Sequence, residues 1–126
     1  MPVTRRAFLL ALAISVAAAG CGGPQGPPDT GVDLTTPVRS LPGWDALAAD
    51  LGLTGPQLDS LADWVDVFRE GLDISRRHDT EAERRASEHD WWTESERSLA
   101  ALVGEANVAR VITWLEMVFG RRDGAA

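Results

Sequence analysis

The sequence has few of the features on which disulfide-linked, metal-binding or membrane-spanning proteins depend. Its 126 residues include a single cysteine, Cys21, and no lysine, so every basic side chain other than histidine is an arginine. One cysteine excludes an intramolecular disulfide and a paired-cysteine metal motif. The apolar run at residues 7–19 has only 13 residues, whereas a helix needs about 20 to cross a bilayer. We therefore expect that this run does not form a transmembrane helix.

Sequence patterns of catalysis are also missing. The chain contains neither an HExxH motif nor a serine in a GxSxG context. Its carboxylates are spread along polar helix faces, where they are ordinary solvated charges. An acid–base pair needs a cleft that gives two carboxylates different pKa values, and a domain this small offers little room for a cleft. We expect no enzymatic activity, no catalytic residue and no cofactor.

Acidic residues outnumber basic ones, with 19 Asp and Glu against 12 arginines and a net charge of −7. Arg5 and Arg6 precede residue 20, and every acidic residue follows it. Residues 21–126 therefore carry ten arginines and a formal charge of −9. A surface of this sign repels nucleic acid and anionic lipid. We expect no nucleic-acid partner, and no membrane binding that depends on charge.

Residues 1–20 have the organisation of an export signal. The order Thr-Arg-Arg-X-Phe-Leu at residues 4–9 resembles the twin-arginine signal, with Arg5 and Arg6 as the paired arginines. The short apolar run that follows is typical of the core of a signal peptide. We predict that residues 1–20 are a signal peptide for twin-arginine export. The alternative is a buried apolar helix with an incidental cysteine.

The predicted signal ends in the tetrapeptide Ala-Ala-Gly-Cys at residues 18–21, which resembles the lipobox of bacterial lipoproteins. The resemblance implies that Cys21 becomes the first residue of the mature chain and carries acyl chains such as palmitate. Two or three acyl chains hold a protein stably on a membrane. We therefore expect a lipid-anchored protein on the extracytoplasmic side of the cell membrane or of the outer membrane, where it faces the periplasm or the exterior.

Composition divides the rest of the chain into three parts. Residues 21–43 begin with the lipidated cysteine and are rich in proline and glycine, without a sustained apolar period. Such a stretch cannot bury enough surface to offset the cost of ordering it, so we expect a tether. Residues 44–120 have the pattern of a helical domain, and residues 121–126 form a tail.

The first half of the helical domain has clear helix signals. Residues 44–51 form a short amphipathic stretch, and Thr54 and Gln57 have the spacing of a capping box. Residues 75–89 are either a solvated extension of the helix that begins at this box or a frayed connection. The apolar seam of that helix consists of Leu58, Leu61, Val65, Phe68 and Leu72.

The second half predicts two more helices. A break is expected at residues 90–93, Asp-Trp-Trp-Thr, with another capping box at Thr93 and Glu96. A third helix then ends near Gly104, and a last helix ends at Gly120. We predict an all-α fold, a small antiparallel bundle of about four helices. The long second helix and the last helix are expected to pack through Leu61, Val65 and Phe68 against Val111, Leu115 and Val118.

Residues 53–57, Leu-Thr-Gly-Pro-Gln, are similar to the LTxxQ motif of the Spy-like family of helical periplasmic proteins. That family includes stress chaperones and metal-stress accessory proteins, and carries the motif before two helices of an antiparallel hairpin. The second position here is residues 103–107, Val-Gly-Glu-Ala-Asn. The resemblance implies a chaperone-like or adaptor role, with a partner in the cell envelope.

Two kinds of side chain are candidates for binding. Trp91 and Trp92 stand in the expected break, where one of them is available to contact a partner; the alternative is that they pack beneath the third helix. His78 and His89 are each followed by an aspartate and are candidate metal ligands. On one helix they would lie about 16 Å apart, too far to share an ion, so solvated histidines are the alternative.

These features together predict a lipid-anchored, non-enzymatic interaction module of the bacterial cell envelope, of adaptor or chaperone-like type. The alternative is an extracytoplasmic metal-binding sensor or scavenger that uses His78, His89 and nearby carboxylates. The first interpretation depends on the anchor and on accessible tryptophans, and the second depends on the histidines.

Overall fold

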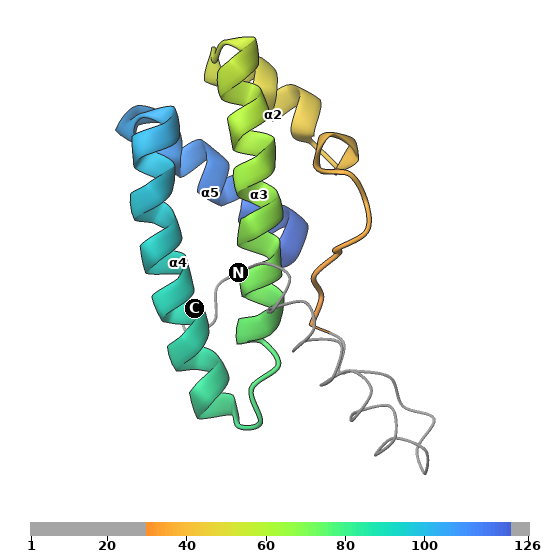
Figure 1. Ribbon diagram of the computed structural model, residues 1–126, viewed down its shortest axis with the longest axis vertical. Helices are drawn as coiled ribbons and strands as arrows, with labels where there is room; N and C mark the ends of the chain where they lie inside the picture. The colour runs from red at the N-terminus through yellow and green to blue at the C-terminus, as the bar shows by residue number, and fades with distance from the viewer. Residues whose placement is uncertain (1–29, 122–126) are drawn as a thin grey trace, which may run out of the picture.

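The computed structural model describes residues 30–121, which form an all-α domain (Figure 1). This part of the chain contains four α-helices and no strand, so the predicted fold class is confirmed for it. No helix within it is long and apolar enough to cross a membrane. The predicted signal peptide with Arg5 and Arg6, and the predicted lipidation site Cys21, lie outside the described residues. The elements are the 3-10 turn η2 (Val38–Ser40) and the helices α2 (Trp44–Leu51), α3 (Gly55–Ser75), α4 (Glu81–Val103) and α5 (Glu105–Phe119).

The two long helices, α3 and α4, lie side by side and antiparallel, joined by a short loop at residues 76–80 (Figure 1). Helix α5 crosses behind this pair, where it contacts α4, and α2 packs against α5 and η2. The helices α2 and α5 therefore cover one side of the α3–α4 pair. The other side, toward the viewer in Figure 1, is not covered by any helix of residues 30–121.

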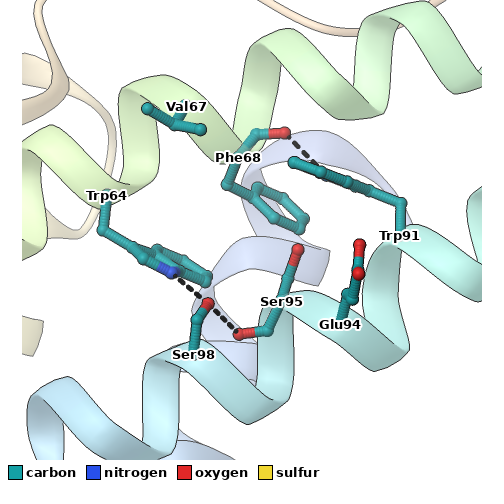
Figure 2. A pocket seen from close by; sticks show the side chains of 7 residues that line it. All are labelled: Trp64, Val67, Phe68, Trp91, Glu94, Ser95 and Ser98. Carbon is teal, nitrogen blue, oxygen red and sulfur yellow. Dashed lines mark hydrogen bonds between the residues drawn. The ribbon is translucent and has the colours of Figure 1, made fainter.

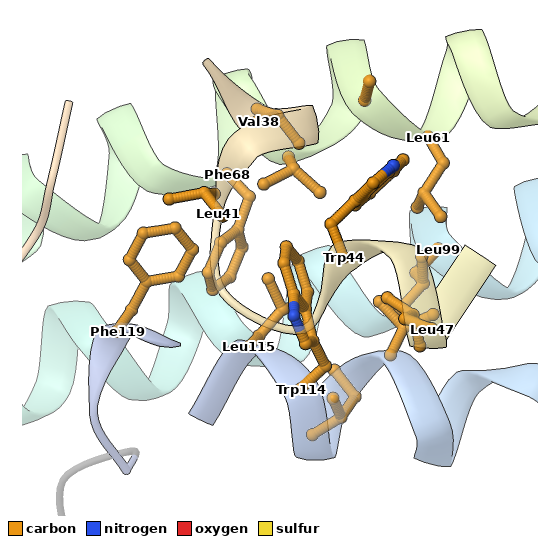
Figure 3. Close-up of a cluster of buried hydrophobic side chains, with 14 of the residues drawn as sticks. Val38, Leu41, Trp44, Leu47, Leu61, Phe68, Leu99, Trp114, Leu115 and Phe119 are labelled. Atoms are coloured by element: carbon orange, nitrogen blue, oxygen red, sulfur yellow. The ribbon is translucent and has the colours of Figure 1, made fainter. Parts of the chain in front are cut away.

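The main neighbour of α3 is α4, whereas the sequence had indicated α5. Helix α4 supplies the fully buried side chains of Trp92 and Leu99 to the core beneath α3. Helix α5 completes that core, so that the rings of Phe68 and Phe119 have centroids 6.3 Å apart (Figure 3). The predicted facing residues do share one buried cluster, although Val118 is only partly buried: the cluster includes Leu61, Val65, Phe68, Val111 and Leu115.

Helix α4 is continuous through the expected break at residues 90–93, so that prediction is wrong. Its capping box is at Thr80, whose side chain accepts a hydrogen bond from the backbone N–H of Glu83. Thr93 caps nothing, because its hydroxyl donates to the carbonyl oxygen of His89 within the helix, at 2.9 Å. The break was misplaced because a helix with a buried face outweighs the local signal of two tryptophans followed by a threonine.

The capping box predicted before α3 is confirmed. The side-chain oxygen of Thr54 accepts from the backbone N–H of Gln57 at 3.2 Å, and the Gln57 side chain accepts from the backbone N–H of Thr54 at 2.9 Å. Pro56 stands in the first turn of α3, where a missing backbone N–H costs nothing, because first-turn N–H groups have no helical partner.

Residues 30–43 do not behave as the free tether that their composition suggests. Val38 and Leu41 are only 5% and 4% exposed, and both belong to the main core cluster (Figure 3). The turn η2 directs both side chains beneath α3. The spacer prediction therefore does not hold for these residues, because two well-placed apolar side chains and hydrogen bonds to α3 offset the cost of ordering a Pro- and Gly-rich segment.

Candidate functional site

A groove of about 310 Å³ lies between α3 and α4, on the side that α2 and α5 leave uncovered (Figure 2). We call it the aromatic groove. Four of its lining residues are apolar or aromatic, and the other three are polar residues of α4. The full set is Trp64, Val67 and Phe68 of α3 with Trp91, Glu94, Ser95 and Ser98 of α4.

Three aromatic rings form a row along the aromatic groove. Phe68 is buried at its centre, and the Trp64 ring stacks on it with centroids 5.3 Å apart and planes 12° apart. The Trp91 ring lies on the other side, at 6.3 Å and 25°. Offset stacking of this kind favours a fixed ring arrangement beyond the gain from burial alone. The two tryptophans are therefore held in place without a ligand.

Both indole N–H groups in the aromatic groove are already hydrogen-bonded within the protein. The indole Nε1 of Trp64 donates to the hydroxyl of Ser98 at 2.9 Å, and that of Trp91 donates to the carbonyl oxygen of Phe68 at 2.9 Å (Figure 2). What the two rings still offer to solvent is apolar surface. A ligand gains from the groove mainly by covering that surface.

Gly71 explains how Trp91 reaches its position. A Cβ atom at residue 71 would lie 2.2 Å from Cζ2 of the Trp91 ring, so only glycine allows the indole to lie against α3. Glycine inside a helix costs roughly 1 kcal/mol relative to alanine. Gly71 thus lowers the helix propensity of α3 at this point, but it leaves the space that the Trp91 ring occupies.

Exposed apolar side chains continue the aromatic groove along α3. Val67 and Ile74 are 61% and 65% exposed, and with Trp64 and Gly71 they follow one another at spacings of three and four residues. Such spacing places all four on one face of the helix. The stripe from Trp64 to Ile74 is about 15 Å long at 1.5 Å per residue.

The surroundings of this stripe are acidic. On α3, Asp63 and Glu70 are exposed and lie one helical turn from Val67. On α4, Asp90 and Glu94 are exposed, and Glu94 lines the groove itself. We call these four carboxylates the acidic rim. The nearest basic residue on the same side of α4 is Arg97, one turn beyond Glu94, so the rim has a net negative charge.

The opposite side of α3 carries the buried Arg69, and the partly buried Arg76 directly follows the last residue of the helix. We call these two residues the arginine cluster. Arg69 donates through Nη1 to the carbonyl oxygens of Asp33 and Thr36, at 3.1 and 2.6 Å. Its Nη2 donates to Oδ1 of Asp66 at 2.6 Å. The guanidinium thereby holds the N-terminal segment against α3.

Arg76 joins three parts of the chain. Its Nη1 donates to the carbonyl oxygens of Thr30 and Phe119, at 3.0 and 2.6 Å. Its Nε and Nη2 both donate to Oε1 of the buried Glu88, at 3.2 and 2.8 Å. The N-terminal segment, α4 and the end of α5 therefore meet at one side chain. A shallow hollow of about 450 Å³ beside it is lined in part by Thr30 and Phe119.

Hydrogen bonding lowers the pKa of three carboxyl groups near helix ends and turns. Burial raises the pKa of Asp73, but hydrogen bonds from Arg77 and Thr30 outweigh it, and the net shift is downward. Hydrogen bonds from Thr36 and Thr35 hold the pKa of Asp33 far below its usual value. The Thr80 cap lowers the pKa of Glu83. All three serve the fold, and none lies in the aromatic groove.

The structure separates the two tryptophans that the sequence singled out. Trp92 is 0% exposed and packs edge-on against Phe68 with centroids 4.8 Å apart, so it belongs to the core and cannot meet a partner from this position. Trp91 is half-buried and lines the aromatic groove. Trp64, which also lines the groove, was not among the candidates for binding that the sequence indicated. A signal for the groove was available, because Trp64 and Val67 are both apolar and both lie off the seam of α3.

The two histidines are not brought together with other metal ligands. His78 lies in the loop between α3 and α4, and His89 is on an exposed face of α4. Within residues 30–121, no group of three His, Cys, Asp or Glu side chains is arranged to hold a metal ion. The predicted metal site of the alternative function therefore gains no support from this part of the chain.

Comparisons with protein-family models, with curated proteins and with solved structures find no match to this chain. The physical properties of the site are therefore what indicates a function for this chain. Those properties are an ordered, open apolar surface with a negatively charged border. An arrangement of this type is suited to binding another macromolecule.

Proposed function

We propose that this protein is a lipid-anchored interaction module of the bacterial cell envelope, and that it binds a partner protein through the aromatic groove. The observation that supports this most strongly is the open apolar stripe of Trp64, Val67 and Ile74, where Val67 and Ile74 are 61% and 65% exposed. Leaving apolar side chains in water brings no stability to the domain itself. A partner that covers them would gain the free energy that the isolated domain forgoes.

The anchor proposal rests on the sequence around Cys21, and the fold gives it a consequence. Thr30 is the ninth residue after Cys21. Its hydroxyl donates to Asp73 of α3, and its carbonyl oxygen accepts from Arg76, directly after that helix. Nine residues span at most about 30 Å when fully extended. An acylated Cys21 therefore keeps the domain close to the membrane surface, and an envelope protein is the partner class that this position favours.

Adaptor and chaperone-like roles are both compatible with such a module. The chaperone-like form is supported by the resemblance of residues 53–57 to the Spy-like LTxxQ motif, where Thr54 and Gln57 also cap α3. In either role, the protein acts by covering apolar surface on its partner. We propose no catalytic step.

Replacing Cys21 tests the anchor. The Cys21→Ala variant of the full chain is expected to leave the membrane fraction or to accumulate as the unprocessed precursor, because the sequence contains no other cysteine. Membrane fractionation and intact-mass measurement give the result. A membrane-extracted mature protein with an unmodified Cys21 would contradict the proposal.

Site-specific photo-crosslinking tests the groove in the full-length protein. A photoreactive residue at position 67, in the aromatic groove, is expected to capture a partner in intact cells. The matched control carries the same photoreactive residue in place of Ala49, which is exposed on α2. Equal capture from both positions, or capture from position 49 alone, would place the contact elsewhere and refute the proposed role of the groove.

A further inference from the structure

The shape of the aromatic groove indicates what kind of segment fits it. The groove runs between two antiparallel helices, and its exposed apolar stripe on α3 is about 15 Å long. An amphipathic helix that lies in a groove uses anchors at positions i, i+3 or i+4, and i+7, which span about 10 Å. Because both indole N–H groups are satisfied internally, the groove offers no free indole donor to the backbone of an extended peptide.

The charge of the acidic rim indicates what must flank the apolar face of such a helix. Asp63 and Glu70 lie on the α3 side, Asp90 and Glu94 lie on the α4 side, and all four are exposed. Among the described residues, no ion pair is formed by any of them. Basic residues beside the apolar face of a bound helix would complement these charges on both sides.

We propose that the segment bound in the aromatic groove is an amphipathic helix with arginine or lysine residues beside its apolar face. This inference rests on the proposed function, because it names the chemistry of the partner at the same groove. A second copy of this chain is a poor occupant, since its own groove has an acidic rim and the whole chain carries a net charge of −7. Like charges brought together in this way oppose association.

The test uses the mature chain from residue 21 onward with the substitution Cys21→Ser. Every contact described above joins residues within 30–121, so this chain keeps the core, the helix caps and the arginine cluster. Its five tryptophans are labelled as 5-fluorotryptophan and assigned by single Trp→Phe variants. Trp64 and Trp91 report on the aromatic groove, and the buried Trp44, Trp92 and Trp114 serve as internal controls.

Two designed 18-residue amphipathic peptides are the probes, identical except that one carries Lys and Arg on its polar face and the other carries Glu. The basic peptide is expected to shift the fluorine resonances of Trp64 and Trp91 and to leave the three buried tryptophans unchanged. Its affinity should fall about fivefold when NaCl rises from about 50 to about 500 mM, because salt screens exposed charges. The acidic peptide is expected not to bind.

Charge-reversal variants distinguish the effect of the acidic rim on peptide affinity from the effect of the net charge of the chain. The double variant Glu70→Arg with Glu94→Arg is expected to bind the basic peptide about tenfold more weakly and to gain affinity for the acidic peptide. The matched control is Asp45→Arg with Asp50→Arg. It changes the net charge equally, at exposed positions of α2 that line no part of the aromatic groove. Its affinity for the basic peptide should stay within about twofold of the parent value.

Four results would overturn the inference. Equal binding of both peptides, or equal weakening by the two charge-reversal pairs, would show that the basic character is wrong while the groove remains a contact site. Unmoved Trp64 and Trp91 resonances at up to about 1 mM of either peptide would exclude a helix as occupant. The crosslinking at position 67 would then show independently whether the groove contacts a partner. A shift of these resonances with protein concentration alone would identify a second copy as the occupant.

Discussion

Helix α3 departs on two sides from the usual rule that apolar side chains are buried and charged side chains are exposed. On one side, the buried Arg69 and the partly buried Arg76 form the arginine cluster, which holds the N-terminal segment, α4 and the end of α5 together. On the other side, apolar residues are exposed, because Val67 and Ile74 continue the aromatic groove into solvent. Between the two sides runs the ordinary apolar seam that includes Leu61 and Phe68.

The buried charge and the exposed apolar stripe have different causes. Each arginine of the cluster has partners inside the domain, and no buried side-chain N or O atom among the described residues lacks one. The exposed apolar stripe is not covered within residues 30–121, where Val67 and Ile74 are 61% and 65% exposed. Buried charge thus serves the fold, whereas exposed apolar surface is available for binding. Substitutions on the two sides should differ accordingly, with large effects on stability on one side and on binding on the other.

The largest loss of stability is expected at the arginine cluster. Arg76→Ala leaves the buried carboxylate of Glu88 without its ion-pair partner and removes hydrogen bonds to two backbone carbonyls. Leaving such a charge buried and unpaired costs about 3 kcal/mol or more. Urea unfolding monitored by circular dichroism gives the free energy of unfolding. Arg39→Ala, which breaks an ion pair in which both side chains are mostly exposed, is the control and should cost less than about 1 kcal/mol.

A smaller loss is expected from Gly71→Ala. The added Cβ would meet the Trp91 ring at 2.2 Å, so the indole must move and release its hydrogen bond to Phe68. Overpacking of this kind costs about 1–3 kcal/mol, from which the higher helix propensity of alanine returns roughly 1 kcal/mol. Gly55→Ala is the control, because nothing lies within 4 Å of its added Cβ. Equal stability of the two variants would contradict the close packing of the Trp91 ring against Gly71.

Helix capping gives the next effect and also tests where α4 begins. Thr80→Ala removes the hydroxyl that accepts from the backbone N–H of Glu83 and should cost about 1 kcal/mol, the usual value for a lost N-cap. Thr54→Ala should cost about the same, since its capping box before α3 has the same geometry. Thr93→Ala should be close to neutral, because Thr93 lies inside α4. A large loss from Thr93→Ala would restore the helix start that the sequence first indicated.

The sequence predicted the elements whose signals are local and missed those that depend on tertiary contacts. Thr54, Gln57 and the seam of α3 are readable because capping boxes and apolar periodicity act over a few residues. The first half of α4 was not readable as a packed helix, because it buries Glu88 rather than an apolar residue. That carboxylate is tolerated only because Arg76, twelve residues earlier, pairs with it.

Tertiary contacts also decide which residues form the aromatic groove. Trp91 and Trp92 are adjacent in sequence, and their separation into groove and core follows from the helical geometry of α4, which points neighbouring side chains in directions about 100° apart. The role of residues 30–43 depended on α3 as well, since their carbonyl oxygens are held by Arg69 and Arg76. Composition alone describes such a segment as a linker.

The stability and peptide affinity of the Val67→Asp variant test most directly whether one side of α3 serves stability and the other serves binding. The side chain is 61% exposed and lines the aromatic groove, so the free energy of unfolding should change by less than about 0.5 kcal/mol. A carboxylate at this point adds to the acidic rim but removes apolar surface at its centre, and at least a tenfold loss of affinity for the basic amphipathic peptide is expected. Parent-like affinity, or a loss of stability as large as that of Arg76→Ala, would contradict the account.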